Sequence, residues 1–178
     1  MNTFVLVQIL GAITLILSAI SLQQRKKENL LLIFSCAAAL FVIQYFLTNK
    51  ITGAVLFIIV FIRGLVFFYF KKKNLKPSIA VFVIFQVVTA ISTYLTWQNI
   101  YSIIPFLATV SATYGMWQDN MKHTRKAMLF TKSSLIFYNF IAGMYTGMIT
   151  NVVDSVSLMI AMHRFDRKNP TNPQSHNN

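Results

Sequence analysis

Residues 51–70 are ITGAVLFIIVFIRGLVFFYF, an apolar run with a single charged side chain, Arg63. A helix of about 20 apolar residues is long enough to cross the hydrocarbon core of a bilayer. Within lipid, every backbone N–H and C=O needs a partner inside its own segment, so such a run must be helical. The stretch therefore predicts a transmembrane helix.

Six further apolar runs flank this one, near residues 4–22, 29–48, 78–97, 101–117, 127–144 and 146–163. The chain has 178 residues and is 56% hydrophobic, which is more apolar surface than a soluble domain of this size can bury. We therefore predict an all-α integral membrane protein, with seven transmembrane helices in a single transmembrane domain at residues 1–165. The polar segment 166–178 is predicted to be a disordered cytoplasmic tail.

The basic residues predict the orientation of these helices. Most of the sixteen lysines and arginines follow the first, third, fifth and seventh runs, whereas Lys50 alone lies on the opposite side. The positive-inside rule then places the N-terminus outside and the C-terminus in the cytoplasm. A net charge of +12 can indicate nucleic-acid binding. Because the charges lie between apolar runs, we instead expect the lipid bilayer as the partner and no nucleic acid.

A weak internal repeat relates the two halves of the chain. Residues 42–65 align without gaps to residues 136–159 at an offset of 94, which superposes two Thr-Gly pairs. The alignment predicts a 3+1+3 layout, with repeat 1 at about 1–70, a linker helix at 78–97 and repeat 2 at about 101–163. Both triplets then run in the same direction, which is a parallel repeat about an axis along the membrane normal.

The last apolar run contains Asp154 in a polar stripe with Gly147, Asn151 and Ser155. An unpaired carboxylate near the middle of a bilayer costs at least about 2.5 kcal/mol, so Asp154 should face protein or water. The offset of 94 maps Arg63 onto a position three residues beyond Asp154. At 1.5 Å per residue the two Cα atoms differ by about 4.5 Å in depth. We therefore expect Arg63 and Asp154 to meet between the two triplets, where the aspartate either neutralises the arginine as an ion pair or acts with it on a passing solute.

These side chains predict a polar site near the membrane midplane. The candidate substrate-binding residues are Arg63, Asn139, Asn151 and Asp154. Asn139 is either a substrate contact or an interhelical hydrogen bond, the latter being the commoner use of such a residue. Lys132 lies close to the cytoplasmic end of its run, so we expect it to extend to the membrane surface.

No pattern of catalytic or metal-ligating residues is present in the sequence. His123, His163 and His176 lie at or beyond the cytoplasmic ends of the runs and do not cluster with acids. Cys36 is the single cysteine, which excludes a disulfide within the chain. We therefore expect neither an enzyme nor a cofactor.

Several stretches resemble the YgjV-like family of bacterial inner-membrane proteins over about residues 1–165. They are LVQILGAITLILSAISLQQRKKENL near the start, TGAVLFIIVFIRGLV around Arg63, IFYNFIAGMYTG at 136–147 and the final MHRF. The resemblance implies a location in the bacterial inner membrane and names no substrate. The 3+1+3 layout is also similar to that of SWEET-type sugar facilitators and nicotinamide-riboside uptake proteins, which implies transport by analogy of architecture alone.

Two functions remain open at this point. The first is a small-molecule transporter or facilitator, in which two three-helix bundles rock about the midplane site and Arg63 binds an anionic or hydroxyl-rich group. The second is a non-transporting structural or assembly protein, in which Arg63 and Asp154 form an internal ion pair. The sequence leaves the substrate unidentified and a homo-oligomer as an open possibility.

Overall fold

The computed structural model describes residues 3–48, 51–95, 97, 100–141, 143 and 145–166. Within these ranges the chain is helical and contains no strand. The α-helices are α1 (Thr3–Leu22), α2 (Lys27–Leu47), α3 (Ile51–Lys72), α4 (Ile79–Leu95), α5 (Ile103–Trp117), α6 (Met121–Ile141) and α7 (Tyr145–Ala161). A 3₁₀ turn, η1 (Ile100–Ser102), precedes α5, and a π-helical turn, η2 (Met162–Asp166), extends α7.

Six of these helices begin and end within two residues of the limits expected from the apolar runs, and α6 is the exception. It begins at Met121, six residues before the apolar run. The side chain of Asn120 caps its first turn, because its Oδ1 accepts a hydrogen bond from the Lys122 backbone N–H at 2.9 Å. Hydropathy misses these turns because their side chains are polar, although the backbone continues as a helix beyond the apolar part.

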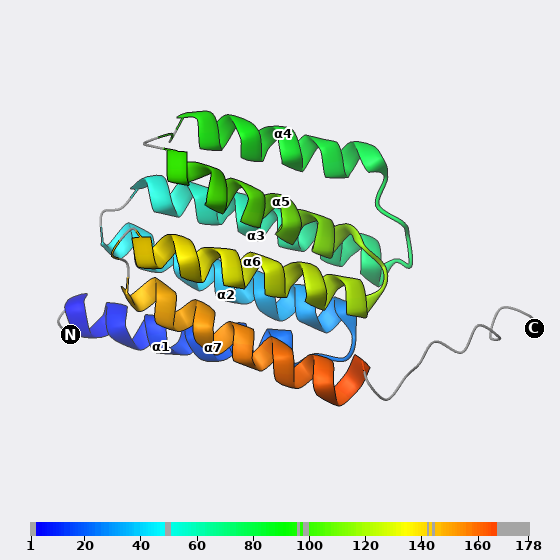
Figure 1. Ribbon diagram of the computed structural model, residues 1–178, viewed down its shortest axis with the longest axis horizontal. Coiled ribbons are helices and arrows are strands. Elements are labelled where there is room, and N and C mark those ends of the chain that lie inside the picture. Colours follow the sequence, from blue (N-terminus) through cyan, green and yellow to red (C-terminus); the bar gives the residue numbers. More distant parts are fainter. Residues whose placement is uncertain are drawn as a thin grey trace, which may run out of the picture.

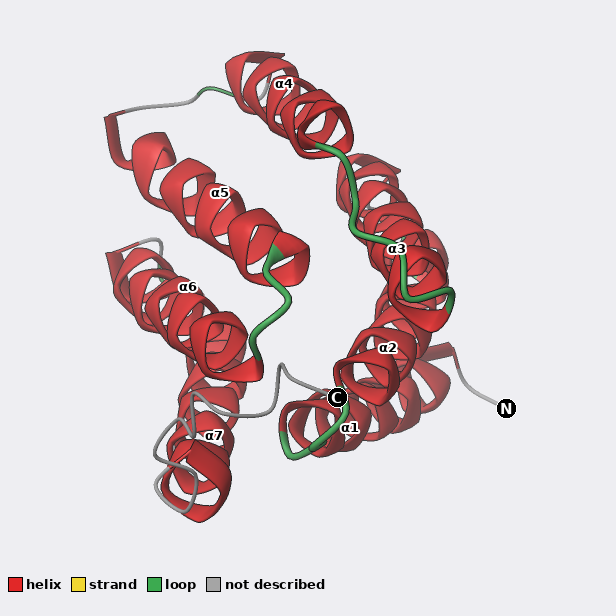
Figure 2. Cartoon of the chain, turned by 90° about the vertical axis from the view of Figure 1, so that its right-hand side faces the viewer, coloured by secondary structure: helices red, strands yellow, loops and turns green. Residues whose placement is uncertain are grey.

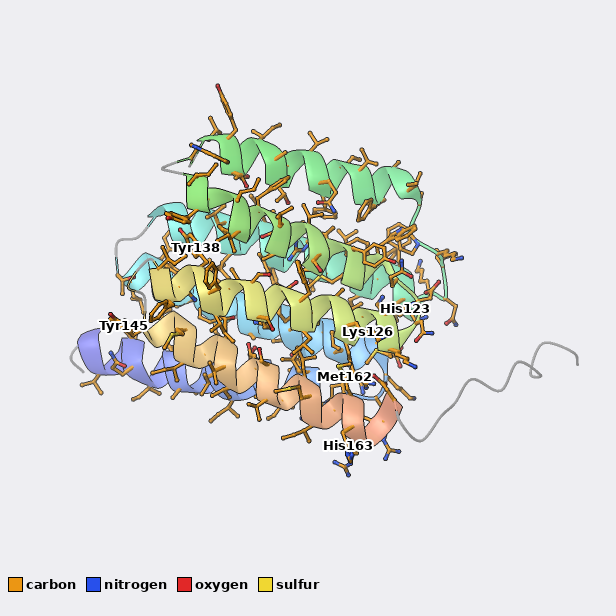
Figure 3. The ribbon with its side chains drawn as sticks, viewed as in Figure 1. His123, Lys126, Tyr138, Tyr145, Met162 and His163 are labelled. Carbon is orange, nitrogen blue, oxygen red and sulfur yellow. The ribbon has the colours of Figure 1, made fainter. Side chains whose placement is uncertain are left out.

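Successive helices run in alternating directions along one bundle axis (Figure 1). The connections after α1, α3 and α5 and the end of α7 therefore lie at the same end of the bundle, here called the basic end. Figure 3 shows His123, Lys126 and His163 at this end, whereas Tyr138 and Tyr145 lie toward the other. The basic segments recognised in the sequence thus meet at one end in three dimensions.

The helices form two curved rows that face each other (Figure 2). In one row α2 packs against α1 and α3, and in the other α6 packs against α5 and α7. The rows meet where α1 contacts α7 and where α3 contacts α5, and α4 lies against α5 at one edge. This arrangement leaves α3, α4, α5 and α6 around one part of the interior.

Apolar side chains cover much of the described surface, and polar ones occupy much of the interior. Large hydrophobic residues of α4 are strongly exposed, including Ile79 at 70% and Ile84 at 59%. In contrast, Thr14, Thr113 and Asp154 are fully buried. An apolar surface around buried polar side chains suits a lipid environment. By length and composition, Val5–Leu22 and Lys27–Leu47 each qualify as a membrane span among the described residues.

Candidate functional site

Asp154 is the centre of a buried polar cluster that joins three helices. Its side chain on α7 is fully buried. Lys132 on α6 approaches it with Nζ at 2.7 Å from Oδ2. Ser18 on α1 donates a hydrogen bond to the same carboxylate, at 3.0 Å from Oδ1 and 2.9 Å from Oδ2. The carboxylate therefore has both a cationic partner and a hydroxyl donor, which offsets the cost of removing it from water.

The expected ion pair between Arg63 and Asp154 is wrong. Arg63 instead donates a hydrogen bond from Nη1 to Thr113 Oγ1 on α5 at 2.7 Å. The physical reason is the side-by-side arrangement of the helices, because α3 packs against α2 and α5, whereas α7 packs against α6 and α1. The expectation that Lys132 extends to the membrane surface is also wrong, because Lys132 turns inward to Asp154 and its side chain is only 15% exposed.

The two candidate asparagines lie at the α6–α7 contact. Asn151 is buried and donates a hydrogen bond from Nδ2 to the Gly147 carbonyl one turn earlier, at 2.9 Å. Asn139 packs against the same glycine from α6, since a Cβ built at Gly147 would lie 2.8 Å from Asn139 Nδ2. Of the two readings left open for Asn139, the position beside α7 favours a role in joining helices.

Arg63 borders a cavity of about 360 Å³ between α3, α4, α5 and α6. This volume lies at the lower end of the roughly 300–1,000 Å³ typical of small-molecule sites. Asn139, Asn151 and Asp154 are not among the lining residues, so the fold does not bring the four candidates together. The lining residues are Leu56, Ile59, Val60, Arg63, Thr89, Ser92, Thr93, Ser102, Pro105, Phe106, Thr109 and Tyr138.

The cavity lies in the half of the bundle farther from the basic end, and Arg63 is its deepest polar group. At 1.5 Å per residue, Arg63 is about 18 Å along α3 from Ile51. Thr89 on α4 and Thr109 on α5 are each about 9 Å from the ends of their helices at that side. Arg63 therefore lies closer to the basic end than Thr89 and Thr109, and the cavity wall combines hydroxyl groups with apolar side chains.

Arg63 has few partners for a buried guanidinium. It is only 3% exposed, and Nε has no hydrogen-bond partner. All four acidic residues of the chain lie in the described ranges, and none forms an ion pair with Arg63. An arginine carries five N–H donors and keeps its charge, so Arg63 brings a charge without an ion-pair partner to the wall of the cavity.

The sequence reasoning missed the contribution of α4 to this cavity. Thr89, Ser92 and Thr93 line it, although α4 was expected to serve only as a linker. Their spacing of three and four residues places them on one face of an otherwise apolar helix, which is a signal that could have been used. Thr109 on α5 and Tyr138 on α6 also line the cavity.

A third buried polar cluster lies at the basic end. Arg125 on α6 is 2% exposed, forms an ion pair with Asp166 of η2, and donates a hydrogen bond to the Gln24 carbonyl at 2.9 Å. Its guanidinium carbon also lies 5.2 Å from the centre of the Phe165 ring. This cluster ties the end of α7 to the α1–α2 connection, which is a structural role.

Comparison with known proteins gives one match. The model of the Imp-YgjV family, described as bacterial inner membrane protein, matches residues 5–169. No curated protein and no solved structure matches the chain significantly.

Proposed function

We propose that this chain, which belongs to the Imp-YgjV family of bacterial inner membrane proteins, is a transporter or facilitator of a small solute. The observation that carries the proposal is the cavity beside Arg63, in which a buried cation without a carboxylate partner meets a space of small-molecule size. An isolated buried cation is costly, so its position on the wall of a cavity favours a site for a counter-charge. A binding site for a solute explains both features.

We further propose that all seven helices span the membrane, with the N-terminus outside and the C-terminus in the cytoplasm. Two observations support this topology: the apolar outer surface, and the gathering of the basic connections at one end of the bundle. In this orientation the cavity lies in the outer half of the membrane. Solute would then approach Arg63 from outside, and a change in packing would be needed to release it inward.

Two matching hydrogen bonds support the 3+1+3 repeat. Arg63 on α3 donates to Thr113 on α5, and Ser157 Oγ on α7 donates to the Ala19 carbonyl on α1 at 3.0 Å. The offset of 94 that maps Arg63 onto Ser157 also maps Ala19 onto Thr113. In the proposed repeat, the two contacts between the rows, α3–α5 and α7–α1, are equivalents, as a twofold relation between triplets requires.

The α1–α7 and α3–α5 contacts differ in the side chains that lie at them, and this difference suggests which contact moves during transport. The α1–α7 contact is joined by Ser18 and Asp154, and Lys132 on α6 neutralises the carboxylate. The α3–α5 contact has Arg63 beside the cavity. We propose that the first contact holds the two triplets together while the second changes its packing around the solute.

The alternative function, a non-transporting structural or assembly protein, keeps one observation in its favour. Asp154 and Lys132 form an internal ion pair between α6 and α7 that does not line the cavity, so its evident effect is on stability. In this alternative the pair is Lys132–Asp154 and no longer Arg63–Asp154. It predicts a rigid bundle whose cavity never opens toward the basic end.

Cysteine accessibility from both sides separates these functions. In a Cys36→Ala background, Thr109→Cys places a thiol in the cavity, and Thr131→Cys places one where the native hydroxyl bonds to Ala108 and Ala127 between packed helices. A transporter exposes its site alternately. We expect a charged methanethiosulfonate to modify Thr109→Cys in both right-side-out and inside-out vesicles, and to leave Thr131→Cys unmodified. Modification from one side only, or none, would contradict transport.

A further inference from the structure

Arg63 and Arg125 are both buried guanidinium groups with different charge balances. Arg125 is 2% exposed and pairs with Asp166. Arg63 is 3% exposed and its bond to Thr113 is to a neutral hydroxyl. Lys132, a further cation inside the bundle, also has a carboxylate, that of Asp154. Lys27 is 5% exposed and likewise forms no ion pair, but it donates a hydrogen bond to the Gly115 carbonyl and does not line the cavity. Among the described residues, Arg63 is therefore the buried cation without a carboxylate that borders the cavity.

The lining of the cavity indicates what kind of charge is missing. Arg63 is the only charged residue among the lining residues. A single buried cation neutralises one negative charge, and a dianion would leave a second charge uncompensated at low dielectric. Guanidinium groups bind carboxylates with charge-assisted N–H···O bonds, which makes a carboxylate a suitable counter-charge for Arg63.

The remaining surface of the cavity limits the size and polarity of the rest of the bound solute. A volume of about 360 Å³ admits a small solute. The walls combine the hydroxyl of Tyr138 with apolar side chains such as Ile59 and Phe106. These groups suit a short carbon chain that carries at most a few hydroxyls.

We infer that the solute bound beside Arg63 is a small monocarboxylate, held by its carboxylate on the Arg63 guanidinium. The inference rests on the proposed function, in which the cavity binds the transported solute, and it adds the chemical class of that solute. The hydroxyl of Thr113 orients the guanidinium by accepting its Nη1–H, while Nε is enclosed by protein. Thr113 is in this sense a positioning residue.

The test compares acids with their neutral amides on the full-length protein in detergent micelles. Acetate, lactate and 3-hydroxybutyrate are each titrated beside acetamide, lactamide and 3-hydroxybutyramide, and binding is measured by the shift in unfolding temperature and by calorimetry. The acids should bind and the amides should not. Arg63→Gln should weaken acid binding by about tenfold to a hundredfold, as expected for loss of a charge-assisted pair, and Arg63→Lys should retain part of it.

The acid–amide comparison needs only the wild-type protein, so it decides the question even if Arg63→Gln does not fold. Amides that bind as well as acids would overturn the anionic class while leaving a neutral-solute transporter intact. Binding of neither series would overturn the inference. Acids that bind but are not taken up by proteoliposomes would support the carboxylate site and refute the proposed transport.

Discussion

Replacing Lys132 with methionine should strongly destabilise the protein, because it removes the cation that neutralises a fully buried carboxylate. Lys132 Nζ lies 2.7 Å from Asp154 Oδ2, and the two side chains are 15% and 0% exposed. After the change Asp154 retains only the hydroxyl of Ser18 as a donor. A neutral hydroxyl cannot replace the lost charge.

The magnitude follows from the difference between breaking a buried pair and removing it. At 2.7 Å and an effective dielectric constant of about 20, the attraction is about 6 kcal/mol before desolvation is subtracted. Breaking a buried pair typically costs about 3–5 kcal/mol, and the partial exposure of Lys132 places this case near 3. By contrast, Lys132→Met combined with Asp154→Leu removes both charges and should recover most of the loss.

Thermal unfolding in detergent micelles measures these differences. For a chain of this size, about 3 kcal/mol corresponds to a decrease in Tm of roughly 6–12 °C. Lys126→Met is the matched control, because Lys126 is an exposed lysine on the same helix and its loss should change stability by less than about 0.5 kcal/mol. The reasoning is refuted if Lys132→Met behaves like Lys126→Met, or if the double variant is no more stable than Lys132→Met alone.

Three further outcomes are expected in the same unfolding assay. Gly64→Ala should lower stability by about 1–3 kcal/mol, because the added Cβ would overlap Ser35 Oγ. Adding Ser35→Ala should relieve this loss, since the nearest remaining Ser35 atom, Cβ, is 3.4 Å away. An undiminished loss in the double variant would exclude the overlap as the cause. Arg125→Gln should cost about 3 kcal/mol by leaving Asp166 without its cation, and a change below about 1 kcal/mol would mean that the pair is not maintained. Gly143→Ala should lower stability by about 1–2 kcal/mol through its positive φ of 68° alone, because no atom lies within 4 Å of the added Cβ. A neutral result would indicate a different local backbone.

The sequence alone determined the helices, their approximate limits and the basic end of the bundle. Hydropathy and charge are summed along the chain, so a run such as 51–70 predicts a helix wherever its neighbours lie. The exception, the polar start of α6 at Met121, arises because hydropathy reports the apolar part of a helix and not the continuation of its backbone beyond it. Asp154 was likewise recognised from sequence as a carboxylate that needs a partner.

Only the tertiary structure decided which partner Asp154 has. Position along a helix gives only the depth of a residue in the bundle. The expectations for Arg63 and Lys132 both rested on this depth. The lateral neighbours depend on how the helices pack, and the α6–α7 contact brought Lys132 to Asp154 while the α3–α5 contact brought Arg63 to Thr113. The same packing created the cavity from four helices, including α4, because a space between helices is a property of their arrangement and of no single segment.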